Sequence, residues 1–137
     1  MSISLPTIDQ NGAGVKLTMP PAIMPLSANQ LVVNATGSHA AAVVTAAAPK
    51  DAQGNNQANV LRAIYIGFSA APAAGSTVVV QDGSTVVFEM FLGAANPPPI
   101  VFDPPKSITP GAILTVTVSD PGAGVGTTLY VDGWVHK

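Results

Sequence analysis

The sequence predicts an all-β protein, a single jelly-roll-like β-sandwich with an extended N-terminal arm. Glycine and proline number 13 each among the 137 residues, which is more than globular chains usually carry. Charged residues make up only 9% of the chain, against about 25% in ordinary globular domains, and this low share disfavours a helical bundle. From residue 40 onward, β-branched runs alternate with turn residues at the spacing of a sandwich or barrel.

The first 38 residues are predicted to form the extended arm. Glycines and prolines interrupt this segment at residues 12, 14, 20, 21 and 25, and only short apolar pieces such as Ile23-Met24 lie between them. The apolar content is high for a disordered leader. We therefore expect an arm that docks on a partner or on a neighbouring subunit, with a disordered leader as the alternative.

Residues 39–137 are predicted to be the sandwich domain. Turn signals divide it into seven or eight strands, at 40–48, 60–68, 76–81, 85–92, 100–102, 106–109, 112–119 and 127–136, of which 106–109 is the optional one. Eight strands suit a jelly roll, whereas seven would suit an immunoglobulin-like sandwich.

The period-two alternation of apolar residues predicts which face of each strand is buried. In 112–119 it places four residues inward, namely Ala112, Leu114, Val116 and Val118. In 84–92 it places Val86, Phe88, Met90 and Leu92 inward and leaves Val87 and Phe91 on the outer face, where they suggest a subunit seam.

The other strands follow from local composition. Segment 60–68 is apolar on both faces, which favours a central strand covered on both sides. In 40–48 the β-branched residues 43–45 favour a strand over a helix. Asp82-Gly83 predicts a tight turn between two strands. Prolines flank 100–102, so this piece is expected to pair only briefly, at an edge.

Charge and composition exclude several functional classes. Five Lys and Arg against seven Asp and Glu give a net charge of −2, and the basic residues are scattered, so a nucleic-acid partner is not expected. No apolar run approaches the roughly 20 residues of a membrane span. The chain has no cysteine for disulfides or thiolate metal sites. Its start lacks the pattern of a secretory signal, so we expect synthesis in a cytoplasm.

The inventory of catalytic groups is thin. It holds His39, His136, Glu89 and six aspartates, and no motif for a nucleophile, a metal or a phosphate is present. We therefore expect a non-enzymatic protein without cofactor or metal. Asp82, Asp120 and Asp132 each adjoin glycine or proline and are predicted to serve turns. The glycine run 122–126 is predicted to be a strand connection.

The last strand carries the most informative side chains. Alternation over 127–136 places Leu129, Val131 and Val135 on one face and Tyr130, Asp132, Trp134 and His136 on the other. Tyrosine and tryptophan dominate protein interfaces, so this face is predicted to contact protein. The alternatives are burial, under the arm or in a subunit seam, and stacking on a sugar.

Three segments carry a resemblance to a known group. They are 62–68 (RAIYIGF), 80–88 (VQDGSTVVF) and 124–134 (GVGTTLYVDGW), behind a low-charge leader rich in alanine, glycine and proline. Together they resemble the small jelly-roll structural proteins of tailed bacteriophage virions, some of which are capsid cement or decoration proteins. The resemblance covers about residues 40–135 and rests on pattern.

This resemblance implies a homotrimer on the outer capsid surface of the virion that bridges neighbouring subunits of the major capsid protein. The N-terminal segment would reach across the shell, and there is no catalytic residue to transfer. The residues predicted to make protein contacts are Tyr65, Phe91, Tyr130, Trp134, Ile23 and Met24. The alternative function is a receptor- or glycan-binding tip module of a tail or head fibre.

Overall fold

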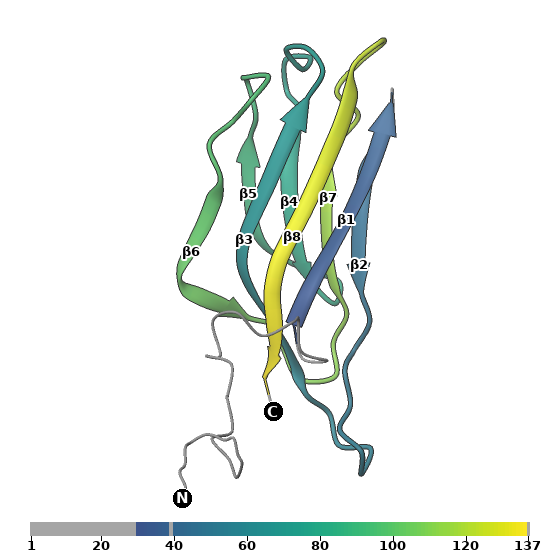
Figure 1. The fold of residues 1–137 in the computed structure, drawn as a ribbon, viewed down its shortest axis with the longest axis vertical. Coiled ribbons are helices and arrows are strands. Elements are labelled where there is room, and N and C mark those ends of the chain that lie inside the picture. Colours follow the sequence, from purple (N-terminus) through teal and green to yellow (C-terminus); the bar gives the residue numbers. More distant parts are fainter. Residues whose placement is uncertain (1–29, 39, 137) are drawn as a thin grey trace, which may run out of the picture.

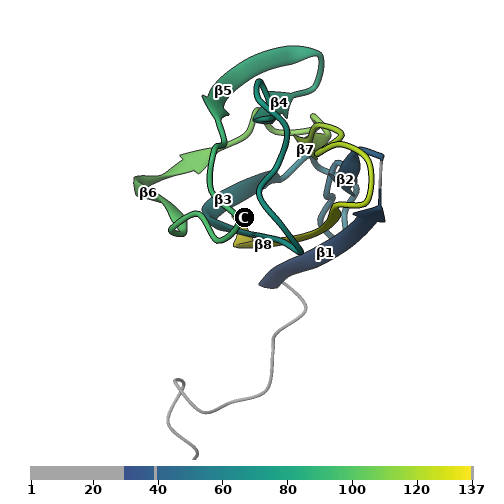
Figure 2. The same cartoon turned by 90° about the horizontal axis from the view of Figure 1, so that it is seen from above.

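A computed structural model describes residues 30–38 and 40–136, and within them every regular element is a strand. The strands form two antiparallel four-stranded sheets that face each other as a β-sandwich, seen edge-on in Figure 2. Their bounds are β1 Gln30–Ser38, β2 Ala42–Ala46, β3 Ala58–Phe68, β4 Thr77–Asp82, β5 Thr85–Phe91, β6 Ile100–Ser107, β7 Leu114–Val118 and β8 Gly126–His136. The predicted all-β class is thus confirmed.

The strand order brings distant parts of the chain together (Figure 1). One sheet has the order β1-β8-β3-β6 and the other β2-β7-β4-β5. The first strand therefore pairs with the last, the second with the seventh, the third with the sixth, and the fourth with the fifth. The connections that follow β3, β5 and β7 gather at one end of the sandwich, the upper end in Figure 1, which we call the loop end.

The core lies between the sheets and follows the predicted alternation in most strands. β7 buries every second residue, as predicted, and β2 does the same. Each fully buried aliphatic side chain contributes roughly 1.5–3 kcal/mol relative to exposure, so the largest of these side chains hold the sheets together. They are Leu61, Ile64, Ile108, Leu114 and Leu129.

β1 lies in the segment that was predicted to be arm. Its nine residues pair with β8, from Gln30 opposite Trp134 to Ser38 opposite Gly126. The sandwich therefore begins no later than residue 30, and not at residue 39. Local sequence did not reveal this strand because its only paired neighbour lies about 100 positions later in the chain. The predicted contact residues Ile23 and Met24 lie outside the described residues.

The predicted inward face of β5 is wrong for Val86, which is 52% exposed. Met90 lies on the predicted side, opposite the fully buried Val78, although the edge position of β5 leaves it 38% exposed. The pairing of β4 with β5 shifts from Val80 opposite Phe88 to Gln81 opposite Val86, so Val87 is an extra, bulged residue. The bulge turns Val87 toward the core, where it packs beside Phe88, and turns Val86 outward. Val87 therefore does not contribute to an outer seam.

Substitutions at the bulge test this reversal of sides. We expect Val87→Ala to lower the free energy of unfolding by about 1 kcal/mol, because it removes methyl groups packed on the core. Val86→Ala is expected to change it by less than about 0.5 kcal/mol, because that side chain is half exposed. Urea unfolding of the two variants measures the difference, and a larger loss for Val86→Ala would contradict the bulge.

Two other local predictions are resolved in β3 and β6. β6 is an edge strand that pairs with β3 in two short stretches on either side of its prolines, so the separate pieces 100–102 and 106–109 belong to one interrupted strand. β3 is an interior strand, as predicted, but its outer face is not fully covered, since Tyr65 is 42% exposed. The tight turn after Asp82 is confirmed, with Gly83 at a φ of +60°.

Candidate functional site

The outer face of the β1-β8-β3-β6 sheet carries a pair of exposed tyrosines. Tyr65 on β3 lies directly opposite Tyr130 on β8, with ring centroids 5.7 Å apart and ring planes at 71°, an edge-to-face contact. Both side chains remain about two-fifths exposed. Each ring limits the freedom of the other, so the pair offers a fixed aromatic surface to a partner.

Trp134 lies on the same outer face, two outward positions beyond Tyr130 along β8, and it is partly buried. Burial alternates as predicted from Thr127 to Val131, and then Asp132 and Gly133 are both buried. Tyr65, Tyr130 and Trp134 form what we call the aromatic stripe. Its members do not make one continuous contact, because Asp132 occupies the outward position between Tyr130 and Trp134.

Asp132 forms an ion pair with Arg62, the extra residue where β3 shifts register against β8. Arg62 Nε donates to Asp132 Oδ2 at 2.9 Å, and Arg62 Nη2 contacts the same oxygen. The hydrogen bond and the negative charge of Asp132 raise the pKa of Arg62. The Arg62 side chain is 55% exposed, whereas the Asp132 side chain that it covers is only 8% exposed. The predicted turn role of Asp132 is wrong, because β8 continues through Gly133.

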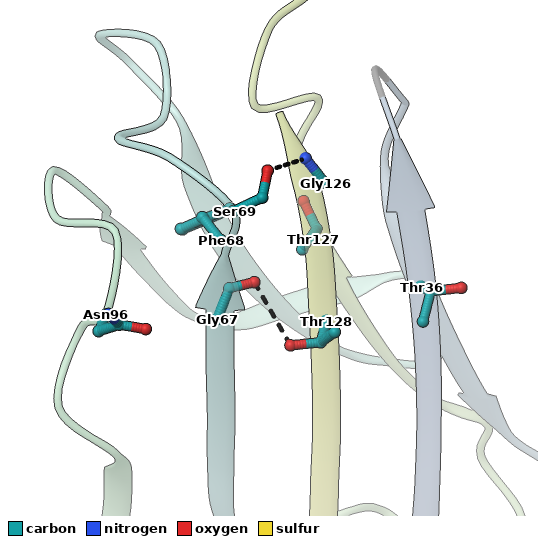
Figure 3. Close-up of a pocket in the computed structure, with 8 residues that line it drawn as sticks. All are labelled: Thr36, Gly67, Phe68, Ser69, Asn96, Gly126, Thr127 and Thr128. Carbon is teal, nitrogen blue, oxygen red and sulfur yellow. Dashed lines mark hydrogen bonds between the residues drawn. The ribbon is translucent and has the colours of Figure 1, made fainter. Parts of the chain in front are cut away.

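An open hollow lies at the loop end of the β1-β8-β3-β6 sheet (Figure 3). Its volume is about 440 Å³. Thr36 on β1, Thr128 on β8 and Gly67 on β3 lie in one row of paired residues across the sheet. The remaining lining residues come from the ends of β3 and β8 and from the β5–β6 loop: Phe68, Ser69, Asn96, Gly126 and Thr127. We call this site the loop-end hollow.

Hydrogen bonds brace the rim of the loop-end hollow. Ser69 and Gly126 bond reciprocally: the Ser69 amide donates to the Gly126 carbonyl at 2.9 Å, and the Gly126 amide donates to Ser69 Oγ at 2.8 Å. The Phe68 amide donates to the Ala95 carbonyl at 2.8 Å, which ties the β5–β6 loop to β3. The site is therefore held in place by its own backbone.

Two hydroxyl groups of the hollow have spare bonding capacity. Thr128 Oγ1 makes only a long contact, 3.4 Å, to the Gly67 carbonyl. Thr127 Oγ1 is buried and has no hydrogen-bond partner among the described residues. Buried polar atoms are almost always paired in proteins, so Thr127 Oγ1 is an exception within the described part of the chain.

The outer face of the second sheet has a different character. Its outward positions hold mostly threonine and valine, with Phe91 at the edge, 74% exposed, and Val43, 47% exposed. Glu89 is the one ionisable residue at the outward strand positions of this sheet. We call the surface formed by Val43, Thr45, Thr77, Val79, Phe91, Thr115 and Thr117 the Val/Thr face. Phe91 therefore lies on the sheet opposite the aromatic stripe.

Three other acidic residues serve local structure. Asp120 accepts from the Gly122 amide at 2.8 Å, as predicted for a turn. Asp82 instead accepts from the amide and the hydroxyl of Thr109, in a different loop. Hydrogen bonds from Asn55, above all from its side chain, lower the pKa of Asp51, which organises the β2–β3 loop.

Residues 30–38 and 40–136 contain no group of three or more His, Cys, Asp or Glu side chains placed to hold a metal ion. The same residues include no helix with the length and apolarity that crossing a membrane requires.

The structure brings together part of what the sequence predicted. Tyr65 and Tyr130 touch, Trp134 shares their face, and Phe91 lies elsewhere. The loop-end hollow was missed, since its lining comes from β1, β3, β8 and a loop. One signal was present in the sequence: Gly67 lies inside a β run, close to its end, and a glycine within a strand often marks a close approach.

Comparisons of the chain with protein-family models, with curated proteins and with solved structures found no match.

Proposed function

We infer that the sandwich is a jelly roll. The strand order supports this assignment. In a jelly roll, one long antiparallel ribbon of eight strands folds over into two sheets, so each strand pairs with the one at the mirror position in the chain. The four pairings of the first with the eighth strand, the second with the seventh, the third with the sixth and the fourth with the fifth follow this rule.

We propose that the protein is a virion structural protein: a capsid decoration, or cement, protein of a tailed bacteriophage that works by contact and not by catalysis. In this proposal it is synthesised in the host cytoplasm and joins the outer surface of the head as a homotrimer. Contacts with neighbouring subunits of the major capsid protein would add binding free energy that opposes opening of the shell.

The observation that carries the proposal is the character of the two outer faces. Large apolar or aromatic side chains are exposed on both, with Phe91 and Val43 on one and Tyr65 and Tyr130 on the other. Contiguous exposed apolar surface is rare on monomers and marks interaction sites. Asp82, Asp120 and Asp132, in contrast, are used in local structure and do not converge on a hollow.

The two faces are proposed to bind different partners. The Val/Thr face is nearly uncharged, which suits a contact between identical subunits, because such interfaces are more apolar than others. The aromatic stripe combines tyrosine, tryptophan and an arginine, the residue types that dominate binding hot spots, which suits the capsid contact. Residues 1–29, with Ile23 and Met24, are the proposed arm that extends this contact.

Single substitutions on the two faces test this division. Trp134→Ala is expected to lower retention on purified heads about tenfold or more, as loss of a hot-spot side chain does, while the trimer persists. Phe91→Ser is expected to weaken the trimer. Quantitative binding to heads and sedimentation of the free protein measure the two effects.

Gln53→Ala, in the exposed β2–β3 loop, is the control and should change neither reading. Unchanged head binding by Trp134→Ala together with Tyr65→Ala would count against the aromatic stripe as the capsid contact.

A further inference from the structure

We propose that the loop-end hollow binds a neutral carbohydrate, a sugar unit without ionised groups. None of the residues that line the hollow belongs to the aromatic stripe proposed for the capsid contact, but the hollow borders the tyrosine pair of that stripe. Sugar binding is therefore tested on the free protein, apart from the decoration role. The chemistry of the lining, the adjacent tyrosines and the bracing of the rim each support it.

The lining offers uncharged hydrogen-bonding groups. Thr36, Ser69, Asn96 and Thr128 contribute hydroxyl and amide side chains, and none of the residues that line the hollow is ionisable. Ser69 Oγ accepts a bond from Gly126, which leaves its own hydrogen free to donate. Such groups match the alternating donors and acceptors of sugar hydroxyls, whereas a phosphate or sulfate ligand would require cationic partners.

The tyrosine pair supplies the second element that a sugar site requires. Tyr65 and Tyr130 are the next outward residues along β3 and β8 from Gly67 and Thr128, a step of about 7 Å along each strand. Their rings provide apolar surface for the C–H face of a pyranose ring. The edge-to-face contact at 5.7 Å fixes this surface beside the hollow.

Gly67 shapes the floor of the site. A methyl group at this position would lie 3.0 Å from Thr128 Oγ1, so the absent side chain is what keeps the floor open. The φ of Gly67 is not in the left-handed region, so alanine is compatible with the backbone there. The volume of about 440 Å³ lies within the range of ligand sites, and the open mouth suits one unit of a longer surface polymer.

Saturation-transfer NMR on the full-length protein tests the proposal with defined probes. The neutral probes are maltotriose, cellotriose, mannotriose and chitotriose, and sialyllactose is the anionic counterpart. We expect transfer to at least one neutral probe and weaker transfer to sialyllactose. Gly67→Ala is expected to lower the affinity about tenfold or more, and Thr128→Val about three- to tenfold.

Two controls separate the hollow from other surfaces. Thr117→Val makes the same chemical change as Thr128→Val, but on the Val/Thr face, and should leave binding unchanged. Trp134→Ala should also leave it unchanged, which distinguishes the hollow from sugar stacking at the far end of β8. Thermal unfolding confirms that each variant is folded.

Three results would overturn the proposal. They are no transfer to any neutral probe, stronger transfer to sialyllactose than to every neutral probe, and transfer that survives both Gly67→Ala and Thr128→Val.

Discussion

Gly133→Ala is expected to lower the free energy of unfolding by about 3 kcal/mol, the upper range for overpacked sites. A Cβ atom at Gly133 would lie 1.9 Å from the Val60 carbonyl oxygen and 3.2 Å from Leu61 Cα, both backbone atoms of β3. β3 bulges at Arg62 and brings its backbone close to β8 at this position. β8 cannot move away, because it is also paired with β1 along nine residues. Urea unfolding measures the loss.

Gly93→Ala is the matched control. Gly93 is exposed, has no heavy atom within 4 Å of the added methyl group and has no positive φ, so a change of less than about 0.5 kcal/mol is expected there. Equal unfolding midpoints for the two variants would contradict the close approach of β3 and β8.

Leu129→Ala is expected to lower the free energy of unfolding by about 3 kcal/mol, within the range for leucines truncated in a well-packed core. Leu129 is fully buried on the inner face of β8, opposite Ile66 on β3 and Ala35 on β1. The same strand carries Thr128 and Tyr130 on its outer face, so the variant is expected to loosen the hollow and the tyrosine pair along with the core.

Val101→Ala on the edge strand β6 is the control for this truncation. Val101 is 63% exposed, so its loss is expected to cost less than about 0.5 kcal/mol. Comparable denaturation curves for Leu129→Ala and Val101→Ala would show that the assigned inner and outer faces of the sheet are wrong.

Periodicity predicted the strands whose pairing is regular. β7 alternates throughout and β8 alternates from Thr127 to Val131, so the inner and outer faces of these stretches follow from the sequence, including the outward placement of Tyr130. β5 shows where this reasoning fails. One bulged residue, Val87, reverses the sides of the sheet on which the preceding residues of β5 lie. Nothing in the composition of 85–91 marks the bulge.

Pairing between distant segments could not be predicted from local pattern. β1 becomes a strand because β8 offers it a partner, and the turn-forming residues before it favoured an arm. Asp132 has a glycine neighbour and was assigned to a turn, but it lies in the middle of β8 and pairs with Arg62 from β3. The residues that line the loop-end hollow come from β1, β3 and β8, which are distant in the sequence, and from the β5–β6 loop.

The central claim is that the chain is a stoichiometric component of phage heads. The most direct measurement is sedimentation of a lysate of the native source on a density gradient, with detection of the chain in each fraction by mass spectrometry. We predict co-migration with large particles at a copy number close to that of the major capsid protein. Recovery only as a free species of about three times the 13.7 kDa chain mass would contradict the claim.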